Sequence, residues 1–311
     1  MNKLITFRNT VLGGMLCLVA VSCSDEGDID NRLPEGKYPI TFATAVEGAT
    51  ATRATADDNW DGGEEVAIQI GGETKKYQVA SSGKLSIAGS DTPFYWQTKT
   101  ITVNAWYPYN GTKPADEDLR VKADQSKDTD YQASDYLEAV DASVAFNNPE
   151  LTFTHRTAKV AVTLVNGEGV DDVATATVTF LNQNGVEGGG KEVTPKTETE
   201  SGVTTYTALL IPQQMQGKKF IKVTLGGYDY FYPPTGENDA NLQKGKLHTY
   251  KITVAKTGLT VTSSSVSPWT GDKEEVDGNA QTVTPGTDGN GSSWTQNGDA
   301  ENITGTEQET N

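Results

Sequence analysis

The strongest β-strand pattern in the chain is Leu151-Thr-Phe-Thr-His-Arg-Thr-Ala-Lys-Val-Ala-Val-Thr-Leu164. Alternate residues of a strand face the same side, so its apolar positions should keep one parity. Here the parity is odd up to His155 and even from Ala158 onward. A single extra residue, such as a β-bulge at Arg156-Thr157, would account for the shift and would bend the strand.

This strand divides a chain whose composition is typical of an all-β protein. The 311 residues are enough for two domains of ordinary size, and 32 of them are glycine. Short runs rich in threonine, valine and tyrosine alternate with turn residues, which favours β-sandwiches. We expect one β-sandwich domain over residues 38–166, ending with the strand above, and a second over 167–276.

The first domain is expected to begin with the strand Ile40-Thr-Phe-Ala-Thr-Ala-Val46, which alternates cleanly and should be half-buried. Residues 47–59 follow it and are small and polar, as in a loop. A single arginine, Arg53, stands in this loop. Spacing alone indicates no more than a solvated surface charge at that position.

Charge and residue counts exclude several kinds of partner and site. The formal net charge is −17, and such a surface repels phosphate backbones, so we expect no nucleic-acid partner. Both cysteines, Cys17 and Cys23, lie near the N-terminus, and the only histidines are His155 and His248. The mature domains therefore have no thiol, and a multi-histidine zinc site is excluded. We expect no metal site, no cofactor and no catalytic residue.

Residues 1–22 have the pattern of an export signal, with Lys3 and Arg8 before an apolar core that is short for a membrane span. The end of this leader, Leu18-Val-Ala-Val-Ser-Cys23, resembles a bacterial lipobox, which implies acylation of Cys23. An ordinary signal peptide with an incidental cysteine is the alternative. The acidic run at 24–28 resembles the surface-export signal of Gram-negative lipoproteins, and residues 23–37 are expected to form a tether.

The C-terminal residues 277–311 are polar. Glycine, threonine, asparagine and acidic residues dominate, and Val283 is an isolated apolar residue. Such a segment buries too little apolar area to offset its ordering entropy. We therefore expect a disordered tail.

Together these pieces resemble the fimbrillin family of type V pilin-like lipoproteins. The resemblance covers residues 1–276. Its most specific part is Leu151-Thr-Phe-Thr-His155 with Ala158-Lys-Val160. The other landmarks occur in the order Cys23, Ile40–Val46, Arg53, Trp60 with Gly63-Glu64, Ala105-Trp-Tyr-Pro-Tyr109, Leu210-Ile-Pro212, Gly245-Lys-Leu-His-Thr-Tyr250 and Val266-Ser-Pro-Trp269.

The resemblance implies two tandem transthyretin-like sandwiches and a structural or accessory subunit of fimbriae that contributes to cell adhesion. It also implies an outer-membrane lipid anchor at Cys23 and assembly with other pilin subunits by donor-strand exchange. An arginine-specific protease would cut after Arg53 and release Cys23–Arg53 with the strand Ile40–Val46. The donor strand comes from the C-terminal end in this family, yet the chain shows little alternation beyond Trp269. Tip and anchor roles therefore stay open beside a stalk role.

Two other classes of function are compatible with the sequence. A non-polymerising surface lipoprotein would bind a glycan or host ligand through exposed aromatic rings, although packing in the core is the preferred interpretation of these rings. The candidates are Trp60, Trp96, Trp106, Tyr228, Tyr230 and Tyr232. An enzyme would need two carboxylates facing each other, and spacing gives no sign of this among Asp57, Asp58, Asp61, Glu64 and Glu65. His155 is expected in the core, hydrogen-bonded to backbone.

Overall fold

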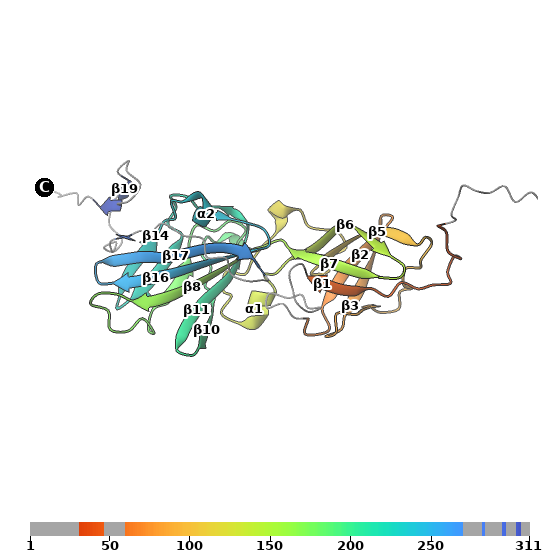
Figure 1. The fold of residues 1–311 in the computed structure, drawn as a ribbon, viewed down its shortest axis with the longest axis horizontal. Helices are drawn as coiled ribbons and strands as arrows, with labels where there is room; N and C mark the ends of the chain where they lie inside the picture. The colour runs from red at the N-terminus through yellow and green to blue at the C-terminus, as the bar shows by residue number, and fades with distance from the viewer. Residues whose placement is uncertain (1–30, 47–59, 270–281, 284–293, 297–302, 306–311) are drawn as a thin grey trace, which may run out of the picture.

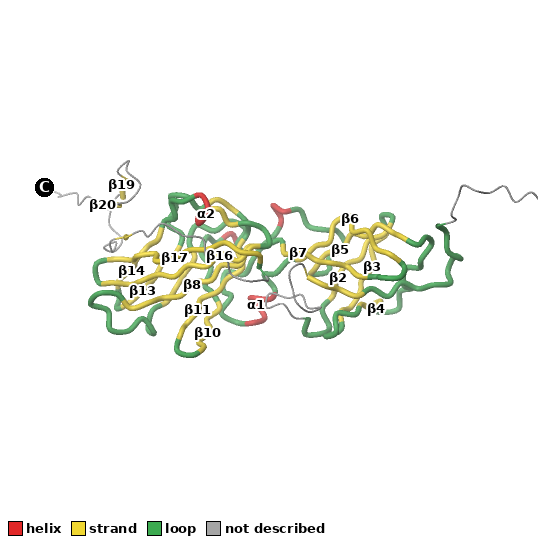
Figure 2. Tube along the Cα trace, viewed as in Figure 1, coloured by secondary structure: helices red, strands yellow, loops and turns green. Residues whose placement is uncertain are grey.

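The computed structural model describes residues 31–46, 60–269, 282–283, 294–296 and 303–305. Two lobes lie side by side along the long axis of the molecule (Figure 1). Strands dominate both lobes (Figure 2), which confirms the all-β prediction. The described helices are short: η1 (Asp116–Asp118), α1 (Asp128–Gln132), η2 (Glu187–Gly189) and α2 (Glu237–Ala240). No helix among the described residues is both long and apolar enough to cross a membrane.

The first lobe is built on a seven-stranded sheet with the order β1-β7-β6-β5-β2-β3-β4. The alternating residues of its strands point into one apolar core, which includes Val66, Ile68, Val103 and Phe153. Its strands are β1 (Ala43–Val46), β2 (Glu65–Ile70), β3 (Glu73–Val79), β4 (Leu85–Ile87), β5 (Thr100–Tyr107), β6 (Leu137–Ala145) and β7 (Glu150–His155).

The second lobe is a two-layer sandwich. Val160 and Ile252 from one sheet share a core with Phe180 and Val223 from the other. The larger sheet has the order β10 (Lys196–Glu200), β11 (Val203–Leu210), β8 (Ala158–Asn166), β16 (Lys246–Ala255), β17 (Gly258–Pro268) and β18 (Thr282–Val283). The smaller sheet has the order β14 (Tyr228–Tyr232), β13 (Ile221–Leu225) and β9 (Thr177–Phe180).

Four further short strands complete the described fold. β12 (Gln213–Gln214) pairs with β15 (Asn241–Leu242), and β19 (Trp294–Gln296) pairs with β20 (Ile303–Gly305). The last two, together with β18, fall in the segment expected to be a tail. Disorder of the rest of 277–311 stays a prediction, because those residues lie outside the described ones.

The prediction of one bent strand over Leu151–Leu164 is wrong. β7 ends at His155 and β8 begins at Ala158, and the two strands belong to different sheets. The parity shifts because Leu151 and Phe153 pack into the first core, whereas the residues from Ala158 onward pack into the second. The two residues between the strands carry the chain from one lobe to the other.

Residues Arg156 and Thr157, which connect the two lobes, form backbone hydrogen bonds to each lobe. The Arg156 N–H donates to the Tyr136 carbonyl at 2.7 Å, and the Thr157 carbonyl accepts from the Gly245 N–H at 2.9 Å. Sheet membership therefore changes at this point, before the boundary expected at Gly167. The domain limits 38–166 and 167–276 themselves stay a prediction.

His155 lies in the junction between the lobes, as the expectation of a core histidine implies, but its partner differs. The side chain is 3% exposed, and its Nδ1 lies 2.9 Å from Asp135 Oδ1, so it contacts a carboxylate and not backbone. Its ring stacks on Trp269 with 3.7 Å between ring centroids and 8° between planes. Trp269 follows β17 directly, so this stack joins the end of the second lobe to β7 of the first.

Candidate strand-exchange site

The candidate site is the position of the N-terminal segment, residues 31–46, in the first lobe. The first half of the segment lies against residues 94–99 and is tied to them by backbone hydrogen bonds. These bonds run from Lys99 N to Asn31 O (2.9 Å), Leu33 N to Gln97 O (2.7 Å), Trp96 N to Tyr38 O (2.9 Å) and Ile40 N to Phe94 O (2.7 Å).

The second half of the segment enters the sheet. β1 pairs in parallel with β7, in a register that places Ala43 opposite Glu150 and Val46 opposite Phe153. On its other side, the Phe42 carbonyl accepts from Leu85 N at 2.9 Å. The Gly83 carbonyl accepts from both the backbone N–H and the hydroxyl of Thr44, each at 2.9 Å. Because β1 and β4 stand at opposite ends of the strand order, these bonds join the two ends of the sheet.

The side chains of the segment complete the core of the first lobe. Ile40 is 3% exposed and Phe42 and Thr44 are 0% exposed, whereas Thr41 between them is exposed. The alternation predicted over Ile40–Val46 is therefore confirmed for these positions, although the strand proper covers only Ala43–Val46. Phe42 packs edge-on against Tyr77 with 6.0 Å between ring centroids.

The chain returns to the same core after the loop. Trp60 is 3% exposed, and its ring makes edge contacts with Tyr107 at 5.6 Å and Phe153 at 6.2 Å between centroids. Burial, together with the nearby carboxylates of Asp135, Glu64 and Asp61, raises the pKa of Tyr107 to about 12, so this phenol stays neutral at physiological pH. The loop 47–59 is thus bounded on both sides by residues that are fixed in the core.

Neither expected modification site falls in the part of the chain that the structure describes. Arg53 falls among residues 47–59, and Cys23 precedes residue 31. Processing after Arg53 and lipidation of Cys23 therefore stay predictions. The described neighbours do show that Arg53 lies between the end of β1 and buried Trp60 in the chain, so a cut there would separate the segment covalently from the rest of the lobe.

Loss of the segment would leave the first lobe with an open groove. Fully burying an Ile or Phe side chain is worth about 1.5–3 kcal/mol, and a net hydrogen bond about 0.5–1.5 kcal/mol. Backbone groups on β7 and beside β4 would lose their partners, and open sheet edges of this kind are templates for another extended chain. Another extended chain of similar alternation would fit this groove.

The acidic residues near the loop have structural partners. The Glu64 carboxylate accepts from the backbone N–H groups of Asp61 at 2.6 Å and Gly62 at 2.9 Å. Glu65 forms an ion pair with Lys76 at 2.9 Å. Asp57 and Asp58 lie outside the described residues. The carboxylates of Glu64 and Glu65 thus hold a turn and a strand pair.

Most of the aromatic rings weighed for ligand stacking are in the core. Trp60, Trp96, Trp106, Tyr230 and Tyr232 are all 5% exposed or less, and the Trp106 Nε1–H donates to the Asn110 carbonyl at 2.9 Å. The packing interpretation is confirmed for these five rings. Tyr228 differs, because it is 64% exposed at the start of β14.

The family model described as fimbrillin-like matches residues 52–269, and the chain belongs to this family. No curated protein matches the chain.

Solved structures with the same fold include two described as candidate cell adhesion proteins. The one from Bacteroides uniformis has 21% identity and a TM-score of 0.54, over 75% of this chain and 99% of that one. The one from Bacteroides ovatus has 19% identity and a TM-score of 0.56, over 75% of this chain and 98% of that one. The tip fimbrial protein Mfa3 from Porphyromonas gingivalis matches at 11% identity, with a TM-score of 0.42 over 74% of this chain and 99% of that one.

Proposed function

We propose that this protein is a structural or accessory subunit of surface fimbriae that assembles by donor-strand exchange and contributes to cell adhesion. The membership of the fimbrillin-like family supports a fimbrial role at the cell surface with other pilin subunits as partners. In this proposal the newly exported chain is held in the outer membrane by acylated Cys23. Cleavage after Arg53 then frees the N-terminal segment and opens the subunit for assembly.

The observation that carries the proposal is the position of the N-terminal segment. It joins the two ends of the seven-stranded sheet, and its side chains Ile40, Phe42 and Thr44 are buried in the core. The following loop contains the proposed cleavage site. A single backbone cut would therefore convert a covalent part of the fold into an exchangeable strand.

Both lobes are proposed to be transthyretin-like. The two-layer packing of the second lobe around Val160, Phe180, Val223 and Ile252 supports this for that half. The donor strand is proposed to come from the residues after Trp269. Trp269 stacks on His155, so that segment begins at the junction of the lobes.

The direct test of processing is the N-terminus of the protein in material shed from the cell surface. We expect Ala54 as the first residue in the native chain, and an uncut chain that keeps acylated Cys23 after Arg53→Ala. Arg32→Ala is the matched control. Arg32 precedes β1 in the sequence, as Cys23 does, and its loss would leave cleavage at Arg53 intact. Surface material in which every chain starts at Cys23 would contradict the proposal.

Exchange is tested separately with a synthetic peptide of residues 38–46. The cut subunit should form SDS-resistant ladders in unboiled samples, and the peptide should suppress them by filling the groove. A peptide with Phe42→Asp is the control, because a charge at the most buried position prevents insertion. Ladders that persist at saturating peptide would rule out exchange at this groove.

A further inference from the structure

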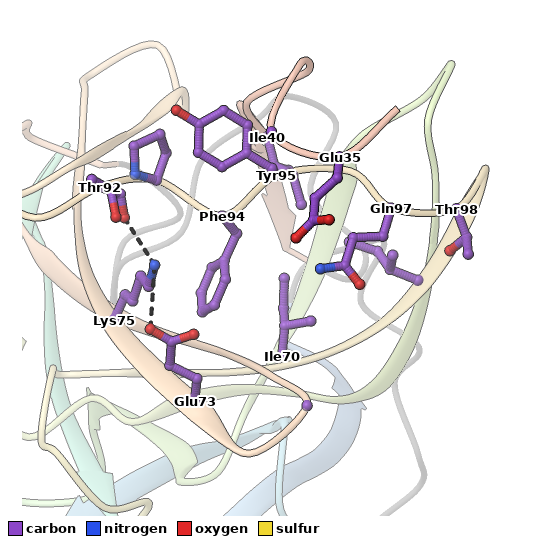
Figure 3. Close-up of a pocket in the computed structure, with 14 residues that line it drawn as sticks. Glu35, Ile40, Ile70, Glu73, Lys75, Thr92, Phe94, Tyr95, Gln97 and Thr98 are labelled. Atoms are coloured by element: carbon purple, nitrogen blue, oxygen red, sulfur yellow. Dashed lines mark hydrogen bonds and ion pairs between the residues drawn. The ribbon is translucent and has the colours of Figure 1, made fainter. Parts of the chain in front are cut away.

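A pocket of about 420 Å³ lies in the first lobe between the N-terminal segment, the β2–β3 turn and residues 92–98. Ile40, Ile70 and Phe94 line its apolar side (Figure 3). Glu35 and Gln97 point into the cavity from one side, and the pair of Glu73 and Lys75 lies on the other (Figure 3). The size falls within the range of pockets that hold small organic ligands.

The charged groups of the pocket are arranged around Lys75. Its ammonium lies 3.3 Å from the Glu73 carboxylate, donates to the Thr92 carbonyl at 3.0 Å and sits 4.4 Å above the Phe94 ring. This cation is therefore already neutralised, and the carboxylate of Glu35 adds a further negative charge. An anionic ligand would meet repulsion here.

The same lining suits a neutral polyhydroxy ligand. The Glu35 carboxylate accepts hydrogen bonds, and the Gln97 amide both donates and accepts them. A sugar ring presents hydroxyl groups at its edge and C–H groups on its face, which match a polar rim around an apolar floor. Tyr95, which also lines the pocket, is 37% exposed and supplies an aromatic ring at the rim.

The pocket is complete only while the N-terminal segment is in place. Glu35, Gly36 and Ile40 all belong to that segment, and the Ile40 N–H is bonded to the Phe94 carbonyl at 2.7 Å. Release of residues 31–46 would remove this wall. A ligand held by both walls therefore favours the seated segment by mass action.

We propose that this pocket binds a neutral saccharide of one or two rings, and that the bound sugar holds the N-terminal segment in the sheet. The first half of this inference stands on the pocket alone, whereas the second half rests on the strand release proposed above. The sugar thereby delays the opening of the subunit.

Binding is tested on the intact chain by saturation-transfer NMR. The probes are glucose, galactose, mannose, N-acetylglucosamine and their β-linked disaccharides, with N-acetylneuraminic acid as the anionic comparison. We expect transfer to at least one neutral sugar and none to the acid. The Kd should rise at least tenfold in Glu35→Ala and in Gln97→Ala, and stay unchanged in Glu117→Gln, which removes an exposed carboxylate outside the pocket. Transfer to no neutral sugar, or an unchanged Kd in both pocket variants, overturns the site.

Coupling is tested on a chain carrying a specific protease site in the loop 47–59. After cleavage, the released fraction of the segment is measured by size-exclusion chromatography with and without the bound sugar. At ten times the Kd, mass action gives about an elevenfold lower equilibrium ratio of released to seated segment. If a sugar binds but the ratio of released to seated segment does not change, the coupling between sugar binding and strand release is overturned, and the binding site is not. A segment that never leaves the cut chain in either condition overturns the proposed strand release and the coupling with it, while the binding result stands by itself.

Discussion

The two lobes complete their sheets in different ways. In the second lobe, central strand β8 is paired on both sides, antiparallel to β11 and parallel to β16, and β16 continues into β17 through a tight hairpin. In the first lobe, the two ends of the sheet meet only across the N-terminal segment, and β1 has a ladder with β7 alone. A single cut in the loop after β1 therefore detaches a strand from the first lobe without breaking a hairpin.

This difference suggests different roles for the two lobes. The main core strands of the second lobe lie C-terminal to residue 157, whereas part of the core of the first lobe lies on the N-terminal segment, which a cut after β1 would separate. In the proposed exchange the first lobe opens, and the second lobe keeps its fold. Four measurements test this contrast, beginning with the largest expected effect.

Phe42→Ala should destabilise the first lobe by about 3–5 kcal/mol, because it removes a fully buried ring and leaves a cavity beside Tyr77. Hydrogen exchange read by mass spectrometry reports each lobe separately. We expect faster exchange in β5, β6 and β7 and little change in β8 and β16.

The matched control for Phe42→Ala is Thr41→Ala, the exposed neighbour on the same segment. It should change stability by less than about 0.5 kcal/mol. Equal effects of the two substitutions, or a loss of protection that spreads evenly into the second lobe, would contradict the idea that the segment serves the first lobe only.

Acid should weaken the second lobe through His248. Its ring is fully buried, Nε2 accepts from the Gln243 N–H at 3.0 Å, and burial lowers the pKa of His248 to about 4. The folded protein thus disfavours the charged form. The contribution of neutral His248 to the free energy of unfolding is fully present above the unfolded pKa of about 6.5. It falls as the pH drops from there toward 4, and it does not change further below that pH. The expected loss between pH 7 and pH 4.5 is about 2–3 kcal/mol.

Urea unfolding at pH 7 and pH 4.5, followed by hydrogen exchange in β16, measures this loss. His248→Gln should flatten the pH dependence of β16, since glutamine does not titrate. Glu138 supplies a second acid-sensitive group: burial opposes its ionisation, but hydrogen bonds from Lys113 and Lys244 outweigh this and lower its pKa. If His248→Gln leaves the pH dependence of β16 unchanged, the loss of stability in acid does not come from His248 and is assigned to the junction around Glu138.

Part of this contrast between the lobes is predictable from the sequence of the N-terminal segment. Alternation over Ile40–Val46 correctly predicts burial of Ile40 and Phe42, because a period of two follows directly from strand geometry. The same parity places Thr44 on the buried face, but it does not predict the partner of its hydroxyl, the carbonyl of Gly83, which lies 39 positions further along the chain. The closure of the sheet depends on such non-local bonds and leaves no local pattern.

The parity shift at Arg156-Thr157 shows the same limit. It marks the right position, yet a bulge within one strand and a crossing between two sheets produce the same alternation. The two are distinguished only by pairing partners, namely β6 for His155 and β11 and β16 for Ala158 and the residues after it. The sequence does not predict the pocket lined by Glu35 and Gln97 either, because its walls come from three separate parts of the chain.

The junction between the lobes should contribute a smaller energy. Trp269→Leu keeps an apolar side chain against His155 but removes the stacked ring, and such aromatic pairs are worth about 0.5–1.5 kcal/mol beyond their buried area. A double-mutant cycle with His155→Leu should give a coupling free energy in that range from urea unfolding. A coupling energy near zero would mean that the two rings are neighbours without stabilising the junction.

The smallest effect is expected at Tyr228, the one aromatic of the six weighed for ligand binding that stays 64% exposed. It follows the turn Gly226-Gly227, whose positive φ angles of 61° and 84° suit a two-residue hairpin, so the turn itself does not need the tyrosine ring. Tyr228→Ser should change the free energy of unfolding by less than about 0.5 kcal/mol, measured by urea titration. A loss above about 1 kcal/mol would show that the second lobe also depends on an exposed strand end. An unchanged stability leaves this ring of the second lobe free for surface contacts.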